Sequence, residues 1–172
     1  MGRYYKFVAN GKSGGNADHR GHLCGKFFPL NKEKYTGSVI PTYRSSWEFS
    51  LMQWADRNSN ILQWSSESLI VPYKDPTRID PNSGKPTIHK YIVDFNVVVK
   101  QKDGSIRKFL VEVKPASQTK APKKTKRTTE ASYQEKLRTY VKNCAKWKAA
   151  TIVAKQRGWS FILITEKELG IK

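Results

Sequence analysis

Residues 91–114 read YIVDFNVVVKQKDGSIRKFLVEVK, and this stretch decides the fold. Two runs rich in β-branched and aromatic residues flank the turn sequence KDG at positions 102–104, a pattern that predicts a β-hairpin. With a three-residue loop whose last residue takes the left-handed conformation, the register places Asp94 directly opposite Glu112. Directly opposed side chains lie on the same face, with Cβ atoms about 5 Å apart. The hairpin is therefore expected to bring two carboxylates together.

A lysine belongs to the same group. Lys114 is two residues beyond Glu112 and shares its face. Most charged strand residues belong to a solvated, salt-bridged face, and that interpretation stays open at this point. Against it, Leu110, Val111 and Val113 indicate strands that are buried on both faces, where unpaired charge is costly. Opposed carboxylates also repel unless a cation lies between them, and Mg²⁺ binds carboxylate oxygens while keeping several waters. The lysine would then orient an attacking water or help to deprotonate it.

The spacing of Asp94 and the sequence Glu112-Val113-Lys114 resembles the active-site signature of the PD-(D/E)XK nuclease superfamily. One position departs from the signature, because Val93 stands where proline is expected. That proline shapes the backbone and carries no catalytic group. The resemblance implies a nuclease that uses Mg²⁺ or Mn²⁺.

The composition indicates a basic, single-domain protein. The chain has 172 residues, enough for one domain with a real core. Its 32 Lys and Arg residues against 14 Asp and Glu residues give a formal net charge of +18. This excess predicts a polyanionic partner, with DNA as the first candidate and an anionic membrane surface as the alternative. No apolar stretch approaches the roughly 18 residues of a spanning helix, and residues 1–6 lack the apolar core of a signal peptide. We therefore expect a cytoplasmic protein.

The N-terminal segment is rich in glycine. Residues 1–42 show no sustained periodicity, and they predict an irregular basic arm in front of a nuclease-like domain at residues 43–172. His19, His22 and Cys24 have a spacing that could ligate zinc. No fourth ligand follows nearby, so a flexible loop is the stronger interpretation.

The first helix is predicted to begin at Ser45, because Ser45 followed three residues later by Glu48 is a capping-box signature. Trp47, Leu51 and Trp54 then recur at helical spacing and form one apolar face. Glu48 lies on the flank of that face, from which its carboxylate could point toward the sheet.

The remaining elements complete an α/β fold. Residues 68–72 are the best candidate for a strand before the hairpin, and Pro72 would end that strand or place it on an edge. Residues 74–87 contain three prolines and an Asn-Ser-Gly turn, which predict a long loop. A helix is expected over about 130–156, then a strand and a last helical turn within 159–168. The order α-β-β-β-α-β-α predicts a mixed sheet flanked by helices, the layout associated with the PD-(D/E)XK nucleases.

The long helix is predicted to carry an apolar stripe and a basic face. The stripe comprises Tyr133, Leu137, Tyr140, Val141, Cys144, Trp147, Thr151 and Ala154. The basic face comprises Lys136, Arg138, Lys142 and Lys146.

Residues 115–127 contain no acid and no bulky apolar residue. Such a run is usually a solvated loop, but this one follows directly on Lys114, which favours contact with a phosphate backbone. The predicted DNA-binding residues are Lys120, Lys123, Lys124, Lys126, Arg127, Lys142 and Lys146.

A narrower resemblance joins these pieces. The chain resembles the head completion proteins of large contractile-tailed bacteriophages over roughly residues 25–170. The segments that carry the likeness, in collinear order, are GKF at 25–27, NKEKY at 31–35, YRSSWE at 43–48, WSSE at 64–67, FLVEVKP at 109–115, NCAKW at 143–147, GWSF at 158–161 and TE at 165–166. Two features depart from the family: the glycine-rich arm before Gly25 and the long segment between Pro76 and Pro86.

The resemblance implies a DNA endonuclease that acts on packaged genome ends before tail attachment, in the host cytoplasm or the virion head. Metal ligands are implied at Glu48, Asp94 and Glu112, with Lys114 catalytic. Phage portal or neck proteins are the implied partners. The endonuclease subunit of the heteromeric transposases has a similar layout, so a restriction or transposition nuclease remains an alternative. A catalytically idle DNA-binding plug that closes the head is another.

Overall fold

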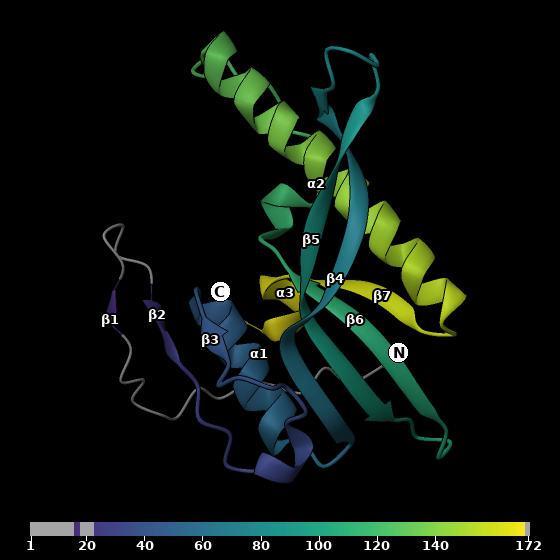
Figure 1. Cartoon of the computed structure of the whole chain (residues 1–172). Coiled ribbons are helices and arrows are strands. Elements are labelled where there is room, and N and C mark those ends of the chain that lie inside the picture. Colours follow the sequence, from purple (N-terminus) through teal and green to yellow (C-terminus); the bar gives the residue numbers. More distant parts are fainter. Residues whose placement is uncertain (1–15, 18–22, 171–172) are drawn as a thin grey trace.

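A four-stranded mixed sheet forms the centre of the computed structural model, which describes residues 16–17 and 23–170 (Figure 1). The strand order is β4-β5-β6-β7. The strands are β4 (Ile61–Ile79), β5 (Pro86–Lys100), β6 (Ile106–Val113) and β7 (Ser160–Ile164). Neighbours β4, β5 and β6 pair antiparallel, whereas β7 lies parallel to β6. A parallel pair needs a crossover connection, and the long helix α2 (Glu130–Gln156) supplies it.

Smaller elements complete the chain. The helices are α1 (Ser46–Arg57) and α3 (Glu166–Leu169), with short 3-10 turns η1 (Lys32–Lys34) and η2 (Ala116–Gln118). A separate sheet joins β1 (Asn16–Ala17), β2 (Leu23–Lys26) and β3 (Thr42–Tyr43). From α1 onward, the element order matches the order predicted from the sequence.

The predicted hairpin register is confirmed. Phe95 pairs with Val111, and the Gln101 N–H donates to the Ser105 carbonyl at 2.7 Å across the turn. Gly104 has a φ of +83°, which is the left-handed conformation that the three-residue loop requires.

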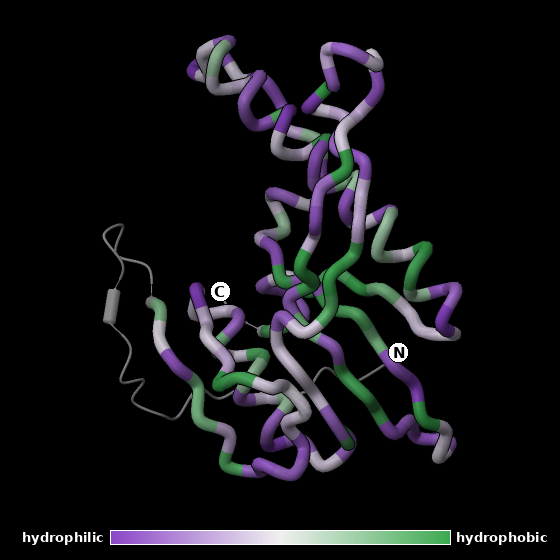
Figure 2. The backbone as a smooth tube through the Cα atoms, viewed as in Figure 1, coloured by the Kyte–Doolittle hydropathy of each residue, from purple (hydrophilic) through white to green (hydrophobic). Residues whose placement is uncertain are grey.

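Two hydrophobic cores lie on the sheet. One packs α1 and α3 against the strands, with Leu51, Met52, Phe95 and Val111 among its buried residues. The other packs α2 against the strands through residues such as Val93, Leu110 and Ala150. Figure 2 shows the apolar residues concentrated in the sheet and the hydrophilic ones toward the far end of the β4–β5 pair. Both faces of β6 are thereby covered, as its apolar run predicted.

The segment predicted as a long loop is instead a two-stranded ribbon. Asp75 pairs with Thr87 and Ile79 with Pro86, so β4 and β5 continue far beyond the sheet and project beside the N-terminal half of α2 (Figure 1). The turn is confined to residues 80–85, where the Asp80 N–H donates to the Lys85 carbonyl at 2.9 Å. The loop prediction was wrong because β4 is an edge strand, where a proline costs no ladder hydrogen bond.

Helix α1 begins as predicted, with one difference. The Ser45 hydroxyl accepts from the Glu48 N–H. The Glu48 carboxylate accepts from the Arg44 N–H at 2.8 Å, not from the Ser45 N–H that a full capping box requires. Glu48 therefore holds the chain entering the helix.

The face of α2 that packs on the sheet shares Trp147 and Ala154 with the predicted stripe but is otherwise rotated from it. The buried residues are Asn143, Trp147, Ala150 and Ala154, whereas Val141 is exposed and Cys144 half-buried. The small alanine side chains allow the helix to approach the sheet closely. A prediction that follows the bulky apolar residues therefore misses this face. The helix ends at Gln156, as predicted, with Arg157 as its C-cap residue. The next residue, Gly158, has a φ of +69°, the left-handed conformation common after a helix C-terminus.

Part of the predicted N-terminal arm belongs to the core. Phe27 is 8% exposed and lies in the α1-side core. The N–H groups of Leu30 and Asn31 donate to the buried Asp56 carboxylate at 3.0 and 3.1 Å, and the Thr36 N–H donates to the Trp64 carbonyl at 2.9 Å. A boundary at residue 42 thus divides a packed unit. His19 and His22 of the zinc interpretation lie outside the described residues.

Within residues 16–17 and 23–170, no helix is both long enough and apolar enough to span a membrane.

Candidate active site

Three of the predicted site residues meet where the C-terminal end of β6 lies against the middle of β5. The Asp94 carboxylate accepts from the Val113 N–H at 2.9 Å. Glu112 is 3% exposed, and its Oε1 lies 3.0 Å from the Lys114 ammonium nitrogen. The other carboxylate oxygen of Glu112 accepts from the Tyr91 hydroxyl at 2.5 Å. The solvated polar face that the sequence left open is therefore excluded for Glu112.

The two carboxylates of this cluster stabilise the positive charge of Lys114. Burial, and after it the neighbouring Glu112 carboxylate, raises the pKa of Asp94 to about 8. Burial alone would lower the pKa of Lys114, but the Glu112 and Asp94 carboxylates outweigh it and raise that pKa. Burial and the Glu112 charge also raise the pKa of Tyr91, so its hydroxyl stays protonated and continues to donate.

Glu48 lies at the edge of this cluster. Its negative charge is among the causes that raise the pKa values of Asp94 and Lys114, so α1 presents it to the site. Its carboxylate is also hydrogen-bonded to the Arg44 N–H. The carboxylate thus lies near the carboxylate pair, while its hydrogen bond comes from the Arg44 N–H and not from the Ser45 N–H that the capping box predicted.

Lys146 lies on the sheet side of α2, and the predicted outer basic face was wrong for it. Its ammonium lies 5.6 Å from the centre of the Tyr91 ring and 5.9 Å from that of Tyr73. Burial lowers its pKa, while the Glu112 charge acts in the opposite direction. Lys146 is consequently a second half-buried cation beside the carboxylates.

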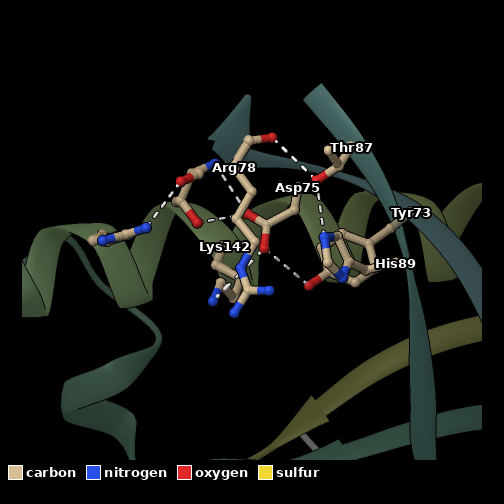
Figure 3. A network of polar contacts seen from close by, with 8 residues as sticks. Tyr73, Asp75, Arg78, Thr87, His89 and Lys142 are labelled. Atoms are coloured by element: carbon tan, nitrogen blue, oxygen red, sulfur yellow. Dashed lines mark hydrogen bonds and ion pairs between the residues drawn. The ribbon is translucent and has the colours of Figure 1, made fainter. Parts of the chain in front are cut away.

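Lys142 also points toward the ribbon and not outward. Its ammonium lies 3.6 Å from the Asp75 carboxylate, which is buried. Figure 3 shows this carboxylate among Tyr73, Thr87, His89 and Lys142. The Asp75 carboxylate also accepts from the Thr77 N–H at 2.9 Å. The contact fixes the base of the ribbon to α2.

The basic run after Lys114 lies on the surface. Five of its predicted DNA-binding residues are exposed: Lys120, Lys123, Lys124, Lys126 and Arg127. Lys124 forms an ion pair with Glu130 at the start of α2. The exposure of these five residues is compatible with the predicted phosphate contacts.

A divalent cation fits this site through two carboxylates. Among the described residues, no three His, Cys, Asp or Glu side chains are grouped closely enough to hold a metal ion by themselves. Mg²⁺, however, is usually held by one or two carboxylates together with waters and substrate phosphates. Asp94 and Glu112 supply such a pair. The pKa of Asp94 is raised first by burial and then by the Glu112 charge, and a cation would offset both by stabilising the ionised carboxylate.

The sequence analysis did not assign Tyr91 or Lys146 to the carboxylate cluster. Tyr91 reads as one more aromatic strand residue, and the contact with Glu112 spans 21 positions. Lys146 recurs at helical spacing with other lysines. The sequence NCAKW at 143–147, which resembles the phage head completion proteins, was a signal that could have pointed to Lys146.

Comparison with known proteins bears on this arrangement. The family described as TnsA-like endonuclease N terminal matches residues 58–166, which include the carboxylate pair, Lys114 and α2. The chain is also similar to the head completion nuclease of Enterobacteria phage T4, with 35% identity over 155 residues. The aligned part covers 86% of this chain and 96% of that protein. These findings confirm the resemblance drawn from the sequence.

Proposed function

Because the chain belongs to the TnsA-like endonuclease family, we propose that this nuclease is a metal-dependent DNA endonuclease that acts on packaged phage genome ends during head completion. The likeness to the phage nuclease extends over nearly all of that protein, which supports the head-completion role. The net charge of +18 supports DNA as the substrate.

The observation that carries the proposal is the cluster of Asp94, Glu112 and Lys114. Two facing carboxylates in a covered sheet, one of them 3.0 Å from the Lys114 ammonium, are costly for stability alone. They are useful if they hold a cation against a phosphodiester. An idle DNA plug has no need of this arrangement.

Each residue then has a defined task. Asp94 and Glu112 would hold the cation, which when bound supplies Lewis-acid polarisation and a water of lowered pKa. Because the two carboxylates raise the pKa of Lys114, this residue is protonated and suited to donate to a phosphate oxygen or an attacking water. This favours the orienting role over deprotonation. Tyr91 holds Glu112 in position through its hydroxyl.

Cation binding is expected to be pH-dependent. Since the pKa of Asp94 is raised to about 8 and a ligand carboxylate must be ionised, Mg²⁺ or Mn²⁺ should displace a proton. The affinity should rise as the pH increases from about 6 to 8 and level off above that range. Calorimetric titration in two buffers of different ionisation enthalpy measures the released proton, and cleavage of supercoiled DNA with and without EDTA tests the activity.

An affinity that does not change with pH would contradict the assignment of Asp94. Cleavage that persists in EDTA would contradict the metal-dependent mechanism as a whole.

Glu48→Gln separates the two roles of Glu48. Glutamine can still accept the hydrogen bond from the Arg44 N–H, so the melting temperature should stay within the range of a surface substitution. If Glu48 serves the metal, removing its charge should reduce cleavage by about a hundredfold. We expect this variant to keep the wild-type melting temperature and to cleave DNA at the reduced rate. A variant that cleaves at the wild-type rate would leave Glu48 as a capping residue.

A transposition-type endonuclease remains the second candidate, because the matching family is described as TnsA-like. Such an enzyme needs a partner transposase for strand transfer. Cleavage of free DNA ends by the purified protein alone favours the head-completion role.

A further inference from the structure

A groove opens between α2 and the loop that follows β6. Its volume is about 570 Å³. Ser117, Gln118, Lys120 and Lys123 line it from the loop, and Lys136, Tyr140 and Asn143 are among the residues that line it from the helix. Neither the carboxylate pair nor the cation site uses this space.

Both walls of the groove are close along the chain to residues of the site. Ser117 and Gln118 follow Lys114 by three and four residues, so one wall starts where the catalytic strand ends. On the other wall, Asn143 is 8% exposed and lies one helical turn before Lys146. The Lys146 ammonium lies over the Tyr91 ring, and the Tyr91 hydroxyl bonds to Glu112. One wall of the groove therefore begins three residues after Lys114, and the other ends one helical turn before Lys146.

The lining matches the chemistry of a polynucleotide strand. Ammonium groups lie on both walls, from Lys120 and Lys123 on one and Lys136 on the other, with Glu135 as the opposing charge. Tyr140 provides a half-buried aromatic ring between them. A basic track combined with an aromatic stacking surface is the common arrangement for single-stranded nucleic acid.

The volume of the groove suits a single strand of DNA and not a duplex. Its volume is that of a small-molecule pocket, for which about 300–1,000 Å³ is usual, and protein bounds it on two sides. A short stretch of one strand fits there, whereas a base-paired duplex does not. The duplex would have to remain outside, on the exposed lysines of the loop.

We propose that this groove receives a DNA strand separated from its complement, so that the substrate of the nuclease carries a single-stranded end or branch next to the cleaved bond. The inference rests on the proposed nuclease function. It adds the class of DNA on which the same site acts.

Binding of matched DNA probes tests the groove. The full-length Asp94→Asn protein without metal is titrated with a labelled blunt duplex and with the same duplex carrying an unpaired tail. Tyr140→Leu in this background should weaken binding of the tailed probe about tenfold through lost stacking. For the tailed probe, Lys136→Ala should reduce the slope of log K against log salt concentration by about 0.7, because one contact to a single-strand phosphate is lost. Binding of the blunt duplex should not change.

Lys148→Ala is the matched control, because it removes the same charge from an exposed position of α2 outside the groove. It should affect both probes alike. Equal losses for blunt and tailed probes in Lys136→Ala, or no loss for either, would overturn the proposal. Thermal melts identify a variant that fails to fold. If Tyr140→Leu fails to fold, Lys136→Ala still tests the proposal, because Lys136 is exposed and its truncation should leave the fold intact.

Cleavage assays keep this inference separate from the nuclease function. Metal-dependent cleavage that the two groove variants leave unchanged on every probe would refute the groove alone. Cleavage that survives Asp94→Asn would refute the function on which the inference rests.

Discussion

Asp94→Asn, Glu112→Gln and Lys114→Ala are each expected to abolish DNA cleavage without unfolding the protein. The two carboxylate variants remove the ligands of the proposed cation, whose stabilisation of the transition state amounts to several kcal/mol, so cleavage should fall by about a thousandfold or more. Lys114→Ala removes one charged donor, a loss of about a hundred- to a thousandfold. Initial rates on supercoiled DNA measure all three effects.

The folded state should tolerate these changes for reasons visible in the site. In Asp94→Asn, the amide oxygen of the new side chain can still accept from the Val113 N–H, which Asp94 binds at 2.9 Å. Neutralising Asp94 also removes the repulsion from Glu112 that contributes to its raised pKa, so the melting temperature of this variant should not fall. Glu33→Gln makes the same kind of change at an exposed position of η1 and should keep the wild-type rate.

Wild-type cleavage by any of the three variants, with a native circular dichroism spectrum, would contradict the site assignment. Loss of cleavage together with a collapsed melt would instead show that the cluster serves stability.

The second large effect concerns stability. Phe27→Ala is expected to lower the free energy of unfolding by about 3–5 kcal/mol, because it truncates a buried aromatic ring and leaves a cavity. Phe27 packs edge-on against Phe49 and Trp64, with ring centroids 5.9 and 5.8 Å apart. Urea denaturation followed by tryptophan fluorescence measures the change.

The adjacent residue provides the control. Phe28 is 68% exposed, so Phe28→Ala removes the same side chain at almost no cost in stability. A similar, small effect of both substitutions would show that residues 23–42 do not contribute to the core. That result would restore residue 42 as the boundary of an independent arm.

Local signals in the sequence were enough for the hairpin and its carboxylates. The KDG turn fixes the loop length, and the loop length fixes which residues oppose each other, so the pairing of Asp94 with Glu112 follows from counting. The Ser45 cap, the end of α2 at Gly158 and the Thr165 capping box, which is present in full, are likewise properties of a few neighbouring residues. These features need no knowledge of distant parts of the chain.

Where the prediction failed, the missing information was the tertiary context. The prolines at 76, 81 and 86 predicted a loop, and a proline such as Pro76 is compatible with a strand only where that strand lies at an edge. The edge position of β4 is a property of the whole sheet.

The rotation of α2 has the same origin. Its helical periodicity allowed several faces, and the one with Asn143, Ala150 and Ala154 was chosen because small residues fit closely against the sheet. That rotation turned Lys142 and Lys146 inward.

By itself, the sequence determined the identity and the register of Asp94, Glu112 and Lys114, because a hairpin pairs residues that are close along the chain. Only the tertiary structure decided that Tyr91 and Lys146 join them and that a groove opens between α2 and the loop that follows β6. Tyr91 meets Glu112 through a side-chain contact within the hairpin that the register alone does not specify. The places of Lys146 and of the groove depend on how α2 crosses the sheet, and the crossing is set by packing between segments that are remote in sequence.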